Sequence, residues 1–133
     1  MAAIKVLLVD DERDYLDTLS KRLSKRGVVV ESAYSGEEAL LRLEGFSADV
    51  VLLDVKMGGM DGLTALHKIK ERWPDIEVIM LTGHASVEVA IRGLELGAYD
   101  YLMKPVNFEE LLYKLEDACM RKAHQDNGIR LGK

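Results

Sequence analysis

Five short apolar runs are spaced along the chain. They occupy residues 4–9, 28–33, 49–53, 76–81 and 99–103. Runs of this length, rich in valine, isoleucine and leucine, are typical of strands that are covered on both faces of a sheet. The run at 28–33 is half polar, which predicts that it lies at an edge of the sheet.

Between these runs, apolar residues recur at the three- and four-residue spacing of amphipathic helices. In the first such segment the spaced residues are Leu16, Leu19 and Leu23. Ser35 followed by Glu38 matches a capping box, which predicts the start of the second helix. The other start and stop signals are Gly27, Gly45, Pro74, Gly97 and Asn107.

Strict alternation of strands and helices predicts a parallel sheet with helices on both faces. Right-handed crossovers make such a sheet doubly wound. The simplest five-stranded solution is the flavodoxin-like order 2-1-3-4-5, an α/β fold with five helices. We assign residues 1–123 to this one domain. We expect residues 124–133, which are polar and aperiodic, to form a flexible tail or the start of a linker.

Composition agrees with a single globular domain. Of the 133 residues, 48% are hydrophobic and 31% charged, which suits one buried core. The net charge of −5 argues against nucleic-acid binding by this domain itself. Cys119 is the single cysteine, so no internal disulfide can form. The sequence has neither a membrane-spanning run nor a secretory signal at its start, and we therefore expect a cytoplasmic protein.

Acidic residues follow two of the predicted central strands. Asp10 and Asp11 come directly after the first strand, and Asp54 follows the third. Because the carboxyl ends of parallel strands meet at one edge of the sheet, we expect these carboxylates to lie close together. A cation relieves their mutual repulsion, and carboxylates with room for water and a phosphate favour Mg²⁺.

Two further polar residues are predicted at the same edge. Thr82 follows the fourth strand and offers a hydroxyl, while Lys104 follows the fifth and offers a positive charge. A carboxylate, a metal ion, a lysine and a hydroxyl around one point are the parts of a phosphoryl-transfer site, and the carboxylate itself can be the nucleophile. The alternative interpretation is that an acid after a strand only caps the next helix, which we favour for Asp61.

The sequences at these strand ends resemble the receiver domain of two-component response regulators over residues 4 to about 122. The matching motifs are Leu8-Val9-Asp10-Asp11-Glu12, Leu52-Leu53-Asp54-Val55-Lys56-Met57 with Met60-Asp61-Gly62, Leu81-Thr82-Gly83, and Gly97-Ala98-Tyr99-Asp100-Tyr101-Leu102-Met103-Lys104-Pro105. Each motif is weak alone, but the four in this order are highly specific. The resemblance implies a phosphorylation-controlled switch that assists its own phosphorylation and dephosphorylation, and is not otherwise an enzyme.

The resemblance also implies roles for the acidic residues. Asp54 corresponds to the phosphoacceptor. Asp10 and Asp11 correspond to the acidic pair that organises Mg²⁺, and the backbone carbonyl of Lys56 to a further metal ligand.

Residues that respond to the phosphoryl group are implied in the same way. Thr82 corresponds to the switch hydroxyl, Lys104 to the lysine that pairs with the phosphate, and Tyr101 to the switch aromatic. The bond between Lys104 and Pro105 corresponds to a cis peptide bond. The implied donor is a sensor histidine kinase or a phosphotransfer protein. The resemblance further implies that a partner or a second copy of the chain recognises the face made by the fourth helix, fifth strand and fifth helix.

The loop after the acceptor departs from the family pattern. Gly58 and Gly59 stand where the family usually has a proline after the methionine, and two glycines widen the conformations open to this loop. In the family, the side chains that flank the approach of water to the phosphoryl group correspond to Lys56 and His84. We expect these two residues to modulate the lifetime of the phosphorylated state.

Two other functions are compatible with a site of this kind. A small-molecule phosphatase with an aspartyl nucleophile usually carries a second acid where Lys56 stands, which argues against that function. A receiver-like adaptor that is never phosphorylated does not need the complete set of acids, Thr82 and Lys104. The sequence leaves open whether the chain is a stand-alone receiver or the N-terminal part of a longer regulator.

Overall fold

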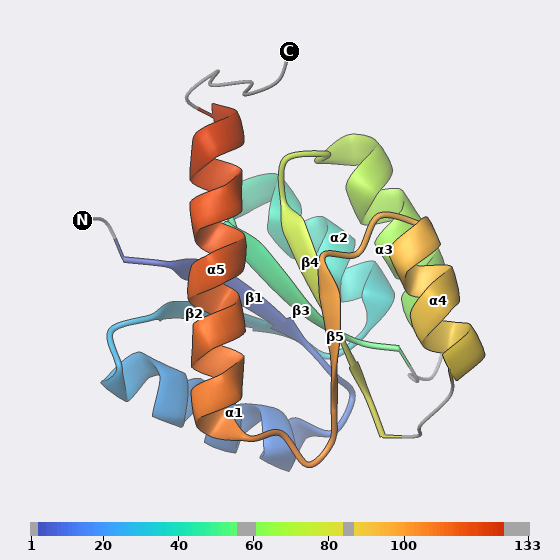
Figure 1. Ribbon diagram of the computed structural model, residues 1–133. Helices are drawn as coiled ribbons and strands as arrows, with labels where there is room; N and C mark the ends of the chain where they lie inside the picture. Colours follow the sequence, from blue (N-terminus) through green and yellow to red (C-terminus); the bar gives the residue numbers. More distant parts are fainter. Residues whose placement is uncertain (1–2, 56–60, 84–86, 127–133) are drawn as a thin grey trace.

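The computed structural model describes residues 3–55, 61–83 and 87–126. Within these ranges strands and helices alternate along the chain (Figure 1). The strands are β1 (Lys5–Val9), β2 (Val29–Ala33), β3 (Val50–Asp54), β4 (Glu77–Thr82) and β5 (Asp100–Met103). The helices are α1 (Arg13–Lys25), α2 (Gly36–Gly45), α3 (Gly62–Arg72), α4 (Val87–Glu95) and α5 (Phe108–Asp126).

The strands form one parallel sheet in the order β2-β1-β3-β4-β5, which confirms the predicted fold. In its register Val9 lies opposite Leu53, and Thr82 lies opposite Met103. The carboxyl ends of β1, β3, β4 and β5 therefore share one edge of the sheet. The residues that follow these strands are brought together there.

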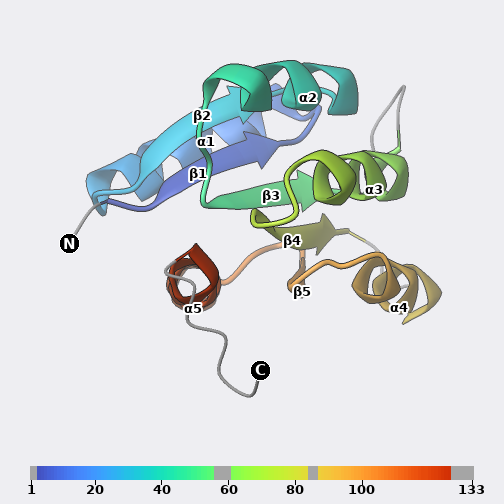
Figure 2. The same cartoon turned by 90° about the horizontal axis from the view of Figure 1, so that it is seen from above.

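Helices cover both faces of the sheet. Figure 2 shows α2 and α3 together on one side of the twisted strands and α5 on the other. The core on the α5 side also includes α1, with Leu16, Leu23 and Leu115 fully buried or nearly so. The core on the opposite side joins α2 and α3 to the alternate residues of the same strands, such as Leu53 and Val78. Both faces of the central strands are thus apolar, as their continuous runs predicted.

The predicted helix ends are also confirmed. Ser35 Oγ accepts a hydrogen bond of 3.0 Å from the backbone N–H of Glu38. Asp61 Oδ1 accepts one of 2.9 Å from the N–H of Thr64, so Asp61 is a helix cap. Gly27 and Gly97 have φ values of 87° and 107°, which glycine adopts without the steric cost of a Cβ atom.

Small differences from the sequence prediction occur at element ends. Each strand begins one residue later than its apolar run, a difference of the size that is usual at the ends of elements. α5 continues to Asp126, past the predicted domain boundary at residue 123. None of the helices in the described ranges is long and apolar enough to cross a membrane.

Candidate functional site

Three carboxylates converge at the carboxyl edge of the sheet. Asp10 follows β1 and is fully buried, and Asp54 ends β3 with an exposed fraction of only 3%. Glu12, at the start of α1, brings an exposed carboxylate to the same place. One oxygen from each of the three lies within 4.8 Å of the others, which makes this the group among the described residues that could hold a metal ion.

The backbone around Asp10 orients its side chain. Asp10 N–H donates to the carbonyl of Ala33 at 3.1 Å, which ties the residue to the end of β2. Asp10 Oδ1 accepts a hydrogen bond of 2.9 Å from the N–H of Glu12. Oδ1 is therefore committed to the turn into α1, and Oδ2 faces the other charged groups.

Lys104 supplies the positive charge of the site. Its N–H donates to the carbonyl of Thr82 at 2.8 Å, and the peptide bond between Lys104 and Pro105 is cis. Its Nζ lies 2.8 Å from Asp10 Oδ2, 2.8 Å from Glu12 Oε1 and 3.6 Å from Asp54 Oδ2. One ammonium thus contacts all three carboxylates.

Burial acts to lower the pKa of Lys104, because it disfavours the charged form. The contacts with Asp10 and Glu12, and then the charge of Asp54, act in the opposite direction and are stronger together. The pKa of Lys104 therefore lies above its ordinary value, and the ammonium stays charged over the physiological range.

The remaining predicted site residues differ in position and in exposure, as far as the structure describes them. Thr82 ends β4 and is 8% exposed. Tyr101 lies on β5 with its side chain 40% exposed. Asp11 is exposed beside Asp10 and is not one of the three clustered carboxylates. Lys56 and His84 lie outside the described residues.

Sequence reasoning gave no role to Glu12, although it quoted the residue in a motif. The available signal was its place as the third acid of the Asp10-Asp11-Glu12 run. Glu12 lies two residues after Asp10, and its carboxylate belongs to the same cluster as those of Asp10 and Asp54. Asp11, between them in the sequence, is not part of this cluster. Sequence reasoning also missed Tyr15, whose ring centroid lies 4.8 Å from Lys104 Nζ.

The start of α3 packs closely against the backbone at the end of β3. Gly62, the first residue of α3, donates its N–H to the carbonyl of Val55 at 3.1 Å. A Cβ atom at Gly62 would lie 2.2 Å from Val55 Cα and 2.7 Å from the carbonyl oxygen of Asp54. Only glycine lets α3 begin this close to the end of β3, which sets the position of Asp54.

The donor set fits a divalent cation. Asp10 Oδ2 is buried, and the group that faces it among the described residues is the ammonium of Lys104, 2.8 Å away. Three carboxylates against one ammonium leave an excess of negative charge at a buried edge. Carboxylate oxygens with room for water and phosphate suit Mg²⁺.

Comparison with known proteins identifies the class. Residues 6–116 match the response regulator receiver domain, and the chain belongs to that family. It is therefore the receiver domain of a two-component response regulator, a phosphoacceptor signalling module.

Individual relatives show how much of a regulator the chain represents. It is 41% identical over 115 residues to the transcriptional regulatory protein ZraR of Salmonella typhimurium, covering 86% of this chain and 26% of that protein. It is 38% identical over 125 residues to the response regulator MprA of Mycolicibacterium vanbaalenii, covering 94% of this chain and 54% of MprA. The chain thus spans about half the length of these relatives or less.

Solved structures show the same fold. The CheY-like receiver domain protein of Methanospirillum hungatei superimposes with a TM-score of 0.88 at 33% identity, covering 92% of this chain and 98% of that one. NtrX of Brucella abortus, in a complex with ADP, gives a TM-score of 0.89 at 31% identity, covering 98% of this chain and 31% of NtrX.

Proposed function

We propose that this receiver domain accepts a phosphoryl group on Asp54 from the phosphohistidine of a partner histidine kinase or phosphotransfer protein. One observation carries the proposal. The buried carboxylate of Asp54 lies beside a second buried carboxylate, that of Asp10, and 3.6 Å from the ammonium of Lys104. Burying like charges together lowers the stability of the folded protein. The cluster is therefore better explained by a role in the reaction than by a contribution to folding stability.

In the proposed reaction an oxygen of Asp54 attacks the phosphorus of the phosphohistidine. The oxygen–phosphorus bond forms while the phosphorus–nitrogen bond breaks, and the imidazole leaves with that electron pair. Lys104 pairs with the negative charge on the phosphoryl oxygens. Asp10, Asp11, Asp54 and the backbone carbonyl of Lys56 are the proposed ligands of Mg²⁺, which when bound supplies further positive charge to the phosphoryl group.

The proposed output is a rearrangement of the face formed by α4, β5 and α5. The hydroxyl of Thr82 then hydrogen-bonds the phosphoryl group, and Tyr101 turns inward from its exposed position. This face carries a group of exposed apolar side chains, which mark a surface for a partner or a second copy of the chain. The group consists of Val87, Ile91, Leu94, Tyr101, Met103 and Tyr113. The proposed location of this signalling is the cytoplasm.

The intact mass of the protein after incubation with phosphoramidate and Mg²⁺ tests the proposal. The wild type should gain one phosphoryl group, and Asp54→Asn, which keeps the shape but removes the nucleophile, should gain none. Asp61→Asn is the matched control, because asparagine still caps α3. A stable phosphoryl group on Asp54→Asn would refute the assignment. A wild type that gains no mass would favour the adaptor that is never phosphorylated.

A further inference from the structure

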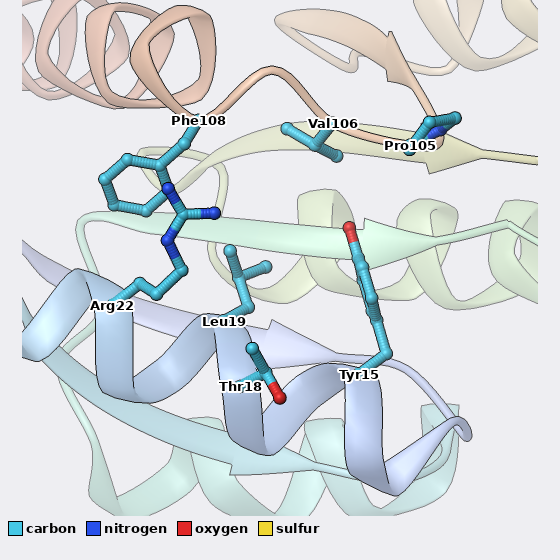
Figure 3. A pocket seen from close by; sticks show the side chains of 7 residues that line it. All are labelled: Tyr15, Thr18, Leu19, Arg22, Pro105, Val106 and Phe108. Carbon is cyan, nitrogen blue, oxygen red and sulfur yellow. The ribbon is translucent and has the colours of Figure 1, made fainter.

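An aromatic ring lies against the ammonium of Lys104. Tyr15, in the first turn of α1, is half buried, and Lys104 Nζ lies over its ring at 4.8 Å from the centroid. Figure 3 shows the Tyr15 side chain rising from α1 toward the segment of Pro105 and Val106. Residues far apart in the sequence, at the start of α1 and after β5, thus meet at the edge of the site.

The ammonium of Lys104 has competing neighbours. Asp10 and Asp54 are buried, whereas the side chain of Glu12 is 64% exposed and lies 2.8 Å from the same Nζ. A lysine ammonium lies at the end of a flexible four-carbon side chain. If only the three carboxylates held it, the ammonium could move toward solvent while keeping its contact with the exposed Glu12. The face of an aromatic ring attracts a cation and also excludes water from that side of it.

Packing, rather than its hydroxyl, holds the Tyr15 ring in place. Tyr15 packs against the core formed by α1, α5 and the strands. Its hydroxyl is buried and has no hydrogen-bond partner among the described residues. Tyr15 also lines a cavity of about 120 Å³ together with residues that include Thr18, Val106 and Phe108 (Figure 3). A phenylalanine can therefore present the same ring to Lys104.

We infer that Tyr15 is a positioning residue that holds the ammonium of Lys104 beside Asp10 and Asp54 for phosphoryl transfer. The inference rests on the proposed function of Asp54. Tyr15 does not touch the reacting atoms. It acts by keeping the positive charge where the phosphoryl oxygens arrive, and by shielding that charge from water.

The rate of phosphorylation by phosphoramidate with Mg²⁺ tests the inference without a partner protein. Tyr15→Phe should stay within about twofold of the wild type, and Tyr15→Leu should slow the reaction about threefold to tenfold. In a Lys104→Ala background, Tyr15→Leu should have no further effect, because no ammonium is left to position. An equal slowing in both backgrounds would overturn the inference and indicate a role in packing only.

Tyr34→Leu is the matched control. Tyr34 is a half-buried tyrosine of the same core. The cation over its ring is Arg13, whose Cζ lies 3.9 Å from the ring centroid, and not Lys104. Its replacement should leave the rate within about twofold of the wild type. If Tyr34→Leu slows phosphorylation as much as Tyr15→Leu, loss of any tyrosine beside α1 suffices and Tyr15 has no specific role.

Proton NMR of the lysine side chains gives a second readout that does not depend on phosphorylation. Protons near Nζ of Lys104 should be shifted upfield by the Tyr15 ring in the wild type and in Tyr15→Phe, and should lose this shift in Tyr15→Leu. Absence of the shift in the wild type would overturn the inference even if Tyr15→Leu failed to fold. If the shift is present but the wild type gains no phosphoryl group, the proposed function of Asp54 fails and the role of Tyr15 in transfer fails with it.

Discussion

Lys104 Nζ lies 2.8 Å from Asp10 Oδ2, although their strands β5 and β1 are separated in the sheet by β4 and β3. The lysine side chain spans this edge and balances charge from more than one strand. Because the same ammonium also contacts Glu12 and Asp54, it offsets only part of the negative charge gathered there. The remaining repulsion has consequences for stability.

Asp54→Asn should stabilise the metal-free protein by about 1 kcal/mol, because it removes one of three clustered carboxylates. Asp11→Ala should stabilise it less, since Asp11 is exposed. Thermal or urea unfolding with EDTA measures these differences. Adding Mg²⁺ should raise the stability of the wild type more than that of Asp54→Asn, because ligands that bind the folded state stabilise it. If Asp54→Asn unfolds more readily than the wild type in EDTA, repulsion is not the dominant effect.

Gly62→Ala should destabilise the protein by about 3 kcal/mol. The added Cβ would meet backbone atoms of Asp54 and Val55, which cannot move aside as a flexible side chain could. Gly45→Ala is the control, because a Cβ there meets nothing within 4 Å, and it should change stability by about 0.5 kcal/mol or less. Urea unfolding of both variants measures the difference. Equal stabilities would show that α3 can shift away from the end of β3.

Glu77 should make stability fall as pH rises. Burial raises the pKa of Glu77 above its ordinary value of 4.5, and the charges of Lys70 and Arg121 oppose this only in part. The folded protein therefore binds the proton more tightly than the unfolded chain. The contribution of Glu77 to stability is fully present below pH 4.5 and is lost as pH rises through the raised folded pKa.

Glu77→Gln removes this titration, so its stability relative to the wild type should increase as pH rises from about 4 to about 7. Urea unfolding at several pH values measures the trend. Glu109→Gln serves as control, because the side chain of Glu109 is 74% exposed in its pair with Arg26, and it should track the wild type. A stability difference for Glu77→Gln that is independent of pH would contradict the prediction.

The phosphorylated state should be long-lived. We expect Lys56 to lie over the phosphoryl group and pair with its charge, and His84 to crowd the approach of water. Neither offers the carboxylate or amide that holds a water in line with the phosphorus. The double variant Lys56→Asn, His84→Glu should therefore lose its phosphoryl group severalfold faster in Mg²⁺ buffer. Decay no faster than that of the wild type would show that other features determine the lifetime.

The sequence by itself determined the fold and most residues at the edge of the site. Continuous apolar runs such as the one ending at Val9 predict buried parallel strands, because both faces of such strands need apolar side chains. Once the strands are parallel, the residues after them must share one edge, which brings together Asp10, Asp54 and Lys104. Caps such as Ser35 and Asp61 were predictable because they depend only on neighbours three residues away.

The tertiary structure alone decided which side chains meet across elements. Glu12 joins the acidic group while Asp11 stays exposed, because the turn into α1 directs these neighbours differently. Tyr15 reaches Lys104, and Gly62 lies behind Asp54, only when helices pack on the sheet at particular depths and rotations. Such contacts join residues far apart in the chain, and a shift of one side chain's length would abolish them. Local spacing carries no information at that precision, because it depends on how the whole core packs.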